Sequence, residues 1–558
     1  MSTPTAHPPA GQAADFDLVD QRLARPAAAM AVGTALSRAT GLGRVAAMAI
    51  ALGVAESRLA DSYNIANTLP NIVYELVLGG VLTSVFIPVL VEELRTRVRE
   101  EAWRSVSALV TAAMLVLVAF TVLTIVAAPW IIDLFSGRVS GSEGAEQHRI
   151  ATFFLRLFAP QIALYGFAAI ADGLLNAHGR FALPAFAPIV NNVVVIATFL
   201  AFTTLTAGTP TNASVLDDTG LKLLLALGTT GGVAAFAAVY LPFLARLPGR
   251  IRARVDLRHA AVRKLGRLSS WTFAYVITNV IGVVVSFYLA NGVQGGVTAY
   301  VTAFAFFQVP IGIAAVSVIT ALTPKMAAHH VDGDQESFRH RTAGGLRLCA
   351  LLMLPATVLY LVLGQPLIAT LLEHGVAQAR SAELVASVLR YFAIGLLPFA
   401  AFQLLRAAFY ARQDARTPAY VNVVENAVTI GLDFALFPIM HVQGLALAHS
   451  LGYVAGCAVA LIPLRRAVGG LDGRRTVIEM AKVVLACAVM ALAMLAAVGA
   501  VDAGLRSGDG RDLLEVATGG VVGLVSFAAA AWALRVRDMA FFVDLLPTGV
   551  RRAVRLAR

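Results

Sequence analysis

Charged residues are scarce in this chain: Asp, Glu, Lys and Arg make up 14% of its 558 residues, whereas 58% are hydrophobic. A soluble domain carries more charge on its surface. Long polar intervals are also missing: each stretch between two apolar runs has only the length of a loop or a short connector. The composition therefore excludes a soluble protein. Recurring apolar runs of about 20 residues, each long enough to cross a bilayer, predict a multi-pass α-helical membrane protein.

Cysteine is rare too. Cys349, Cys457 and Cys487 all fall in apolar segments without paired spacing, which excludes a disulfide framework and a cysteine metal site. The sequence also contains no nucleotide-binding loop and no nucleophile–base constellation. We therefore expect a transporter, neither an enzyme nor a metalloprotein, with no catalytic residues.

Fourteen segments have the length and hydropathy of a bilayer crossing, and the mean hydropathy of the chain is +0.76. The predicted spans are residues 26–55, 63–91, 105–136, 151–177, 184–207, 221–244, 268–291, 297–324, 346–363, 382–410, 418–438, 443–464, 477–501 and 512–534.

The net charge of +11 is unevenly distributed. The two tails and the loops that follow even-numbered spans, with the helix ends that adjoin them, hold 32 Lys and Arg. The loops that follow odd-numbered spans hold 7. Basic residues accumulate on the cytoplasmic side, so both termini are predicted to be cytoplasmic. The positive charge therefore reflects topology, and no nucleic-acid partner is expected. Five cations remain inside spans: Arg38, Arg44, Arg156, Arg390 and Arg406.

The two halves of the chain resemble each other. Pro184 aligns with Pro418, and Asn192 aligns with Asn426. These matches, in the same order along both halves, predict two parallel six-helix lobes around a central cavity, followed by two extra C-terminal helices. The aligned segments are 181–194 with 415–428, 82–93 with 319–330, and 238–249 with 458–469.

The predicted organisation follows from the spans and the repeat. It comprises a disordered cytoplasmic tail (1–25), an N-lobe with spans 1–6 (26–250), a C-lobe with spans 7–12 (251–470), spans 13 and 14 (471–535) and a basic cytoplasmic tail (536–558).

Several long motifs resemble the MurJ/MviN family of lipid II flippases, part of the multidrug/oligosaccharidyl-lipid/polysaccharide exporter superfamily. The resemblance covers spans 1 to 12. The motifs are LSRATGLGR (36–44), NTLPNIVYELVLGGVLTSVFIPVL (67–90), LNAHGRFALPAFAPIVNN (175–192), GLRLCALLMLPATV (345–358) and FYARQDARTP (409–418).

The resemblance implies a V-shaped pair of lobes around a cationic cavity, which moves undecaprenyl-diphosphate-linked disaccharide-peptide to the outer leaflet by alternating access. Spans 13 and 14 would form a groove for the lipid tail. It also implies the bacterial cytoplasmic membrane as the location and lipid II and membrane lipids as partners. Cell-wall synthesis or division proteins are the candidate protein partners.

The sequence departs from the pattern of this family at three positions. Relatives carry paired arginines in span 2, where this chain has Tyr74 and Glu75, and another arginine before the span-8 proline, where it has Ala305. The cavity is therefore expected to be less cationic than in those relatives. Arg406 in span 10 is the candidate replacement.

Arg38 and Arg44 match the two span-1 arginines of the family. A charge at bilayer depth is costly, so it normally faces a partner or a water-filled cavity. Guanidinium groups bind phosphate oxygens in a two-pronged geometry, and we therefore expect this pair to bind the diphosphate of a lipid. The alternative is a structural ion pair with Asp61 or Glu75, or a side chain that extends to the interface.

Two acids accompany these arginines in span 2. Asp61 stands near the start of the span, where it either caps the helix or belongs to a gating pair, and both interpretations remain open. Glu75 lies deep in the span beside Gly79 and Gly80, which favours a position at the cavity.

Span 11 carries candidates for ion coupling. Thr429 and Asp433 are four residues apart and share a helix face that Glu425 continues. Some relatives bind sodium with a span-11 carboxylate and a polar span-7 residue, for which Asn279 is the match. Oxygen ligands suit a hard cation. A proton carrier, coupling to the membrane potential and a packing role for Asp433 stay open, and no other cofactor is expected.

The leading function is lipid II translocation. Export of another polyprenyl-linked glycan, or ion-coupled antiport of a drug within the same superfamily, is the alternative, although Arg38 and Arg44 disfavour a cationic drug. A membrane glycosyl- or phosphotransferase would need catalytic groups in a sizeable loop. The longest outer loops, 137–150 and 208–220, are too short and undistinguished for that role.

Overall fold

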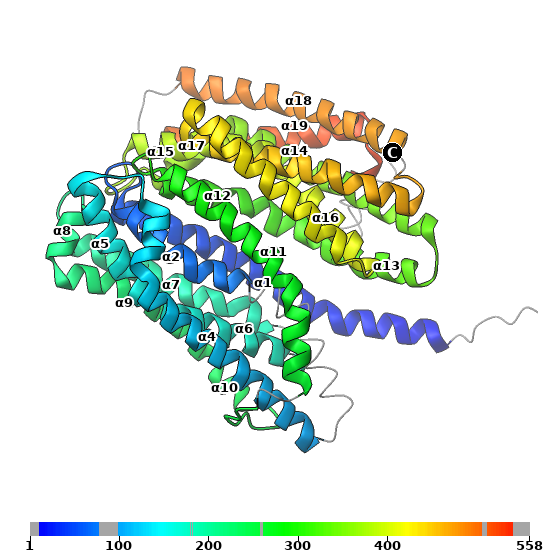
Figure 1. Ribbon diagram of the computed structural model, residues 1–558. Coiled ribbons are helices and arrows are strands. Elements are labelled where there is room, and N and C mark those ends of the chain that lie inside the picture. The colour runs from blue at the N-terminus through cyan, green and yellow to red at the C-terminus, as the bar shows by residue number, and fades with distance from the viewer. Residues whose placement is uncertain are drawn as a thin grey trace, which may run out of the picture.

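The computed structural model describes residues 11–76, 99–178, 180, 182–256, 260–471, 473–504 and 510–539, and every regular element within these ranges is helical (Figure 1). The elements are α1 (Gly11–Leu52), α2 (Leu59–Leu76), α4 (Arg99–Ser136), α5 (Gly141–Phe158), α6 (Pro160–Ala177), α7 (Ala182–Leu205), α8 (Asn212–Asp217), α9 (Thr219–Val239), α10 (Leu241–Leu244), α11 (Ala260–Ala290), α12 (Gly296–Pro310), the π-helix η2 (Ile311–Ala315), α13 (Val316–Val331), α14 (Gln335–Leu372), α15 (Ala379–Ile394), α16 (Leu396–Ala411), α17 (Arg416–Val468), α18 (Gly473–Gly504), α19 (Arg511–Ala533) and the 3-10 turn η3 (Arg537–Met539).

The predicted all-α multi-pass fold is confirmed. Within the described ranges, nine helical segments are long and apolar enough to cross a membrane, and the pair α15–α16, bent by 47°, makes a tenth. The 53-residue α17 contains two predicted spans. Its backbone is non-helical at His441, where φ is 50°, and this residue separates the two spans. The fourteen predicted spans correspond to α1, α2, α4, α5–α6, α7, α9–α10, α11, α12–α13, α14, α15–α16, the two halves of α17, α18 and α19. Residues 77–91 of the second predicted span lie outside the described residues.

Helix ends differ from the prediction where polar sequence continues a helix. α1 begins at Gly11, so residues 11–25, predicted as part of a disordered tail, are helical. The segment is rich in Ala, Leu, Gln and Arg, which favour helix, and the prolines that suggested disorder precede it. Likewise α5 begins at Gly141, inside the predicted loop 137–150. Hydropathy locates the apolar part of a helix but does not locate its ends.

The packing repeats between the two lobes, in agreement with the alignment of residues 181–194 with 415–428, whereas the aligned segment 82–93 lies outside the described residues. α7 packs along α1 in the N-lobe, and α17 packs along α11 in the C-lobe. In both pairs the aligned asparagine faces a glycine. A Cβ added at Gly41 would lie 3.8 Å from Nδ2 of Asn192, and one added at Gly282 would lie 2.8 Å from Oδ1 of Asn426.

The lobes share a hydrophobic core at one end only, within the described part of the chain. That core joins α1, α2, α4, α5 and α7 to α11, α12 and α17, and Phe135 on α4 stacks edge-on against Phe287 on α11, with ring centroids 6.1 Å apart. We call this the interlobe end. At the opposite end the N-lobe core around Trp103 and Leu247 has no buried residue of the C-lobe among the described residues, although the partly buried Val262 of α11 packs against it. The V shape that the family resemblance implies stays a prediction.

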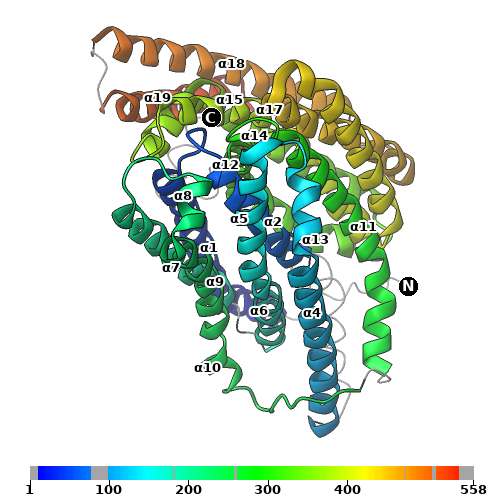
Figure 2. The same ribbon diagram turned by 60° about the vertical axis from the view of Figure 1, so that its left-hand side comes forward.

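The connection between the lobes, residues 245–256, runs from α10 toward α11 at this opposite end, which we call the linker end (Figure 2). Its extended part lies on α4, where the backbone N–H groups of Arg252 and Arg254 donate to Ser107 Oγ (3.2 Å) and Thr111 Oγ1 (3.0 Å).

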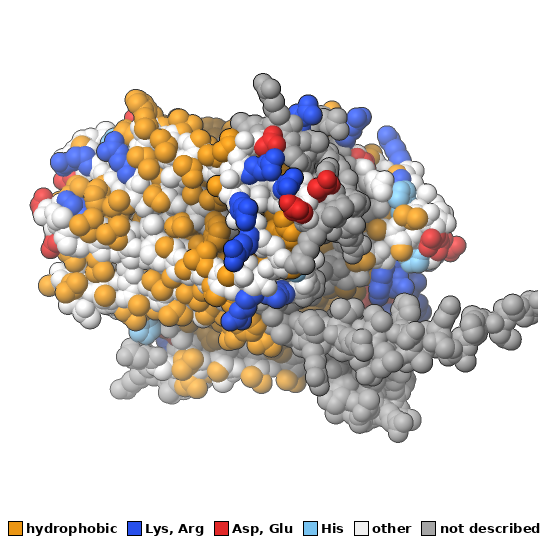
Figure 3. Space-filling view, turned by 90° about the horizontal axis from the view of Figure 1, so that it is seen from below, with side chains coloured by type: hydrophobic (Ala, Val, Ile, Leu, Met, Phe, Trp, Pro, Cys, Tyr) orange, Lys and Arg blue, Asp and Glu red, His pale blue; other side chains and the backbone are white. Residues whose placement is uncertain are grey.

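The outer surface of the bundle is apolar. Hydrophobic side chains cover much of the face in Figure 3, and on α4 alone Val116, Leu123 and Val126 are 63%, 59% and 60% exposed. Such a surface suits lipid contact. α18 and α19 pack on each other and on α14, along the outside of the C-lobe (Figure 1).

Candidate functional site

Helix α1 carries Arg38 and Arg44 and is fixed along α7. Asn192 of α7 donates to the carbonyl oxygen of Ser37 (3.2 Å) and to Thr40 Oγ1 (3.0 Å). At Gly33 the two helices are so close that an added Cβ would lie 2.8 Å from Cβ of Ala185. Arg44 lies eleven residues after Gly33, on the same face of α1, whereas Arg38 projects from another face. The two arginines are about 9 Å apart along the axis.

Arg38 is exposed and lies against the π-helical segment η2 of the C-lobe. A Cβ added at Gly312, in η2, would lie 2.9 Å from Nε of Arg38. Pro310, just before η2, has no N–H to donate and so leaves the carbonyl of Phe306 without its usual helical partner. The hydroxyl of Tyr360 donates to that carbonyl oxygen instead, at 2.7 Å. Arg38 therefore extends from the first helix of the N-lobe to η2 of the C-lobe.

Arg44 is half-buried and directed into the N-lobe, where its charge acts on the hydroxyl groups of Tyr63 on α2 and Tyr165 on α6. Within the described residues neither Arg38 nor Arg44 forms an ion pair with a carboxylate. The two cations thus point to different lobes from one helix. Their guanidinium groups remain available to a ligand.

Asp61 is fully buried at the interlobe end and binds the other lobe. Its carboxylate accepts from the backbone N–H of Gly295 and from the N–H and the hydroxyl of Thr298, each at 2.8 Å. These groups are the unpaired donors at the start of α12, where a negative charge is favoured. Asp61 therefore caps α12 of the C-lobe. The capped helix lies in the opposite lobe and is not the helix of Asp61 itself, as the capping interpretation expected, and the gating interpretation stays a prediction.

Glu56 makes an equivalent contact with a second C-lobe helix. Its Oε1 accepts from the N–H of Gln378 (2.9 Å) and its Oε2 from the hydroxyl of Ser381 (2.6 Å), both at the start of α15. Oε2 also accepts from the N–H groups of Val54 (2.8 Å) and Ala55 (3.1 Å) in its own loop. One carboxylate thus holds the α1–α2 connection against the other lobe.

Arg58 completes this group of contacts. It pairs with Glu143 at the start of α5 (3.1 Å) and donates to the carbonyl oxygen of Asn291, which follows α11 (2.9 Å). The side-chain amides of Asn291 and Gln147 bind each other reciprocally, at 2.8 and 3.2 Å. We call Glu56, Arg58, Asp61 and their partners the interlobe cluster. Together with the shared core, it closes the interlobe end.

Four other positions that the sequence analysis singled out lie on α2, α12 and α16. Glu75 and Tyr74 lie in the last turn of α2, but their side chains are outside the described part of the chain. Arg406 is half-buried on α16, which packs mainly on α17, α14 and α13 within the C-lobe. Ala305 is half-buried on α12.

The span-11 candidates form two groups along α17. In the first, Glu425 accepts from Thr429 Oγ1 (3.2 Å) and from Nδ2 of Asn426 (2.9 Å). Asn279 of α11 contacts the same group, because its Oδ1 accepts from Asn426 (3.4 Å) and its Nδ2 donates to Asn422 (3.3 Å). Asn279 therefore lies beside the amide that binds Glu425.

Asp433 forms the second group, two helical turns beyond Glu425. Its Oδ2 accepts from the hydroxyl of Ser286 on α11 at 2.8 Å. Its Oδ1 is buried and has no hydrogen-bond partner within the described part of the chain. The predicted set of Asn279, Thr429 and Asp433 is thus divided, with the first two beside Glu425.

Sequence reasoning missed Glu56, Arg58 and Ser286. Glu56 and Arg58 lie in a short loop, where a charge ordinarily faces water, and Ser286 resembles any small polar residue of a span. Only the pairing of acids at a span connection, Glu56 and Asp61, could have suggested a buried polar contact.

Known proteins share both the sequence and the fold. A family model described as "Lipid II flippase MurJ" matches residues 48–504. The lipid II flippase MurJ of Burkholderia cenocepacia is 28% identical over 451 residues, which cover 78% of this chain and 82% of that protein. The probable lipid II flippase MurJ of Haemophilus influenzae is 27% identical over 477 residues, covering 83% and 90%.

Solved structures agree. One titled "Lipid II flippase MurJ, inward closed conformation" superposes with a TM-score of 0.72 at 20% identity, covering 90% of this chain and 99% of that one. An inward-facing multidrug resistance MATE family transporter of the MOP superfamily gives 0.61 at 15% identity, covering 79% and 99%. Since the family model matches most of the chain, from the end of α1 through α18, this protein belongs to the lipid II flippase MurJ family.

Proposed function

We propose that this protein moves lipid II from the inner to the outer leaflet of a bacterial cytoplasmic membrane by alternating access. Membership of the family supports the cargo. The observation that carries the proposal at residue level is the pair Arg38 and Arg44, two cations within the bundle without a carboxylate partner in the described part of the chain. A diphosphate supplies the missing negative charge.

The diphosphate role gains support from the contacts of Asp61. The alternative reading of the arginines needs an acid to pair with them, and Asp61 was one of its two candidates. Its carboxylate instead accepts three hydrogen bonds from the start of α12. Arg38 stands between the lobes and Arg44 inside the N-lobe, so a diphosphate held by both would respond to the angle between the lobes.

We propose that the interlobe cluster must open in each cycle. Release of lipid II to the outer leaflet requires an opening at the interlobe end, where the shared core and the cluster join the lobes. The N–H groups at the starts of α12 and α15 then bind water in place of the carboxylates of Asp61 and Glu56. Polar contacts suit this task, because water satisfies exposed carboxylates and N–H groups as well as the closed contacts do.

Ion coupling is proposed on the acidic face of α17. Oxygens of Glu425, Thr429 and Asn279 suit Na⁺, and Asp433, with one buried oxygen unpaired, is a second carboxylate for a cation or a proton. Binding there would favour one angle between α11 and α17. The membrane potential is the alternative source of energy.

The proposed orientation places both termini and the linker end in the cytoplasm, in agreement with the distribution of Lys and Arg. A cysteine introduced at Val255, which is 71% exposed in the linker, should react only with reagent supplied from the cytoplasmic side. One at Thr209, in the exposed connection before α8, should react only from outside. Outside labelling at position 255 would contradict the orientation.

The function is tested in proteoliposomes that contain purified protein and lipid II, with a lytic enzyme or probe that reaches only the outer leaflet. Protected lipid II should become accessible when the protein is present, and a polyprenyl-diphosphate with a different glycan should compete if the site reads the diphosphate alone. Depletion in the host, with a periplasm-restricted probe for lipid II, supplies the cellular measurement. No gain in accessibility, together with transport of another polyprenyl-linked glycan, would assign a different cargo. Cell-wall synthesis or division proteins are the proposed class of protein partner.

A further inference from the structure

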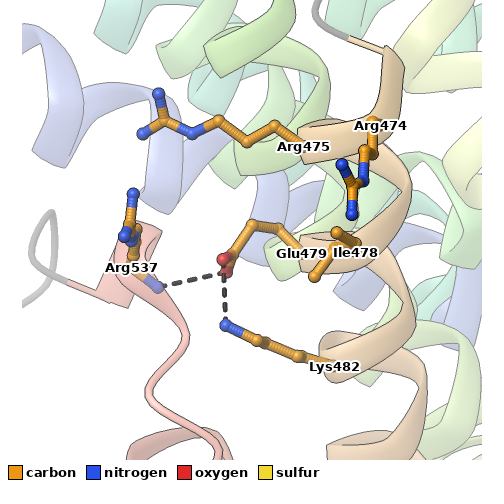
Figure 4. A pocket seen from close by; sticks show the side chains of 6 residues that line it. All are labelled: Arg474, Arg475, Ile478, Glu479, Lys482 and Arg537. Atoms are coloured by element: carbon orange, nitrogen blue, oxygen red, sulfur yellow. Dashed lines mark hydrogen bonds and ion pairs between the residues drawn. The ribbon is translucent and has the colours of Figure 1, made fainter.

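A cationic pocket lies outside both lobes, where α18 begins and α19 ends. It has a volume of about 430 Å³ and is lined by Arg474, Arg475, Ile478, Glu479 and Lys482 of α18 and by Arg537 of η3 (Figure 4). Four cations thus surround one carboxylate. In Figure 4 the Arg475 side chain extends from α18 toward the segment that carries Arg537.

The one carboxylate does not neutralise this charge. Oε1 of Glu479 accepts from Nζ of Lys482 at 3.0 Å, and Oε2 accepts from the backbone N–H of Arg537 at 3.3 Å. Glu479 is therefore occupied in joining α18 to η3. The guanidinium groups of Arg474 and Arg475 have no hydrogen bond or ion pair within the described part of the chain, so the space between the two segments keeps an excess of positive charge.

The walls of the pocket are fixed by a helix of the C-lobe. Arg347 of α14 donates from Nε to Oδ2 of Asp538 (3.0 Å) and from a terminal nitrogen to Thr476 Oγ1 (3.5 Å). Arg347 thereby connects η3 and α18 from behind. The two segments that carry the lining arginines are therefore joined before any ligand arrives, which lowers the entropy cost of binding one.

Apolar side chains show the depth of the pocket relative to the membrane. Val477, one residue before Ile478, is 66% exposed, and Leu485, two turns further into α18, is 53% exposed. Trp532, in the last turns of α19, is 53% exposed, at a position where tryptophan commonly marks the membrane interface. The arginines therefore lie at the level of phosphate groups, directly above a surface suited to acyl chains.

We propose that this pocket binds the phosphate headgroup of an anionic phospholipid of the cytoplasmic leaflet, whose acyl chains lie along α18. Clusters of Lys and Arg between helix ends on this side of a membrane attract anionic lipids, and guanidinium groups grip a phosphodiester through paired hydrogen bonds. The site is separate from Arg38 and Arg44. The proposal rests on the proposed orientation, which the cysteine at Val255 tests independently.

The test is the binding of phosphatidylglycerol to the full-length protein in nanodiscs of phosphatidylcholine, followed with a fluorescent or spin-labelled lipid. In Arg474→Gln/Arg475→Gln the affinity should fall by about 25-fold, since each basic residue near the surface contributes about fivefold. Each single variant should lose about fivefold. The matched control is Arg250→Gln/Arg252→Gln, which removes two exposed cations at the linker end and should leave binding unchanged.

Competition and direct binding by inorganic phosphate identify the class of ligand. Inorganic phosphate at millimolar concentration should neither displace the lipid nor bind measurably, because it lacks the acyl chains that lie on α18. Parent-like affinity in the double variant, or an equal loss in the Arg250/Arg252 control, would overturn the proposal. So would binding of inorganic phosphate that depends on Arg474 and Arg475 while phosphatidylglycerol binds without them. Lipid II transport does not enter this measurement, so its failure and a failure of the proposed function are distinct results.

Discussion

The two lobes have the same packing but opposite intramembrane charges. Gly41 of α1 and Gly282 of α11 occupy equivalent places, each facing an aligned asparagine. Three residues before these glycines, the N-lobe has Arg38 and the C-lobe has Asn279. The helix that begins each lobe therefore presents a cation in one lobe and a neutral amide in the other.

The helices that pack on α1 and α11, which are α7 and α17, differ in charge in the opposite direction. In the alignment that pairs Pro184 with Pro418, Asn191 of α7 stands opposite Glu425 of α17. A glycine of the following span packs on each of them, since a Cβ added at Gly232 would lie 2.7 Å from Oδ1 of Asn191, and one added at Gly456 would lie 3.2 Å from Cβ of Glu425. The repeat has thus kept the backbone contacts and changed the charge. An anion is favoured by the N-lobe helices and a cation by the C-lobe helices.

The largest effect on the contact between the lobes is expected from a substitution of Asp61. Asp61→Ala leaves the N–H groups of Gly295 and Thr298 without an acceptor in the closed state, at roughly 1–3 kcal/mol for each buried donor. The substitution should therefore destabilise the closed state, relative to an open state, by most of that free energy. We expect a cysteine at Val297, fully buried in the shared core, to react with an impermeant maleimide at least about tenfold faster in the variant.

Asp334→Ala is the matched control for Asp61. Asp334 also caps a helix, accepting from the N–H of Ser337 at 2.9 Å, but it does so at the exposed start of α14 within one lobe. Hydrogen bonds from Ser337 lower the pKa of Asp334, so its stabilising effect is present at neutral pH and is lost as the pH falls through the lowered pKa. Labelling at position 297 should be unchanged in this control. Equal acceleration in both variants would mean that Asp61 is only a local cap.

The acidic face of α17 offers a sharper distinction between the lobes. Glu425→Gln keeps the shape of the side chain and its acceptor for Thr429 but removes the charge. We expect transport to lose its dependence on Na⁺ or pH and to fall on the order of tenfold, while lipid II affinity stays within about twofold. Asp433→Asn, two turns away, shows which carboxylate carries the coupled ion. Unchanged ion dependence in both variants would leave the membrane potential as the source of energy.

A smaller effect is expected at Gly312, where Arg38 contacts the C-lobe. Gly312→Ala places a Cβ 2.9 Å from Nε of Arg38, so the side chain must move by a few tenths of an ångström or more. Displacement from its preferred rotamer costs about 0.5–1.5 kcal/mol, and lipid II affinity should fall by about two- to tenfold. Gly364→Ala, at a helix position where a Cβ has open space, is the control and should bind normally.

The sequence predicted the helices and their order well, because apolar length and the asymmetry of Lys and Arg are properties of the chain itself. The repeat was also readable, since Pro184 and Pro418 mark the same helix start in both lobes. The departures from the family at Tyr74, Glu75 and Ala305 were equally visible in the sequence.

Partners of individual polar residues were not readable. Nothing in the sequence near Asp61 indicates that it caps α12, since that contact joins residues 234 positions apart. Asn279 likewise lies beside Glu425 and not Asp433 because of the register between α11 and α17, which depends on how two helices pack. The pocket at Arg474 and Arg475 is a further example, because only the packing of α19 on α18 brings Arg537 to it.

The central claim is that Arg38 and Arg44 hold the diphosphate of lipid II, and it is tested most directly by lipid II binding to purified, folded variants. Arg38→Ala and Arg44→Ala should each lose about 10- to 150-fold in affinity, the range expected for one hydrogen-bonded charge pair. Their unfolding temperatures should equal or exceed that of the parent, because an unpaired charge has been removed. Lys at either position should restore binding only in part, since it keeps the charge and loses the paired geometry. Arg156→Ala, an exposed cation on α5, is the control and should bind normally. Parent-like affinity in both alanine variants would contradict the account and give the two arginines a structural role.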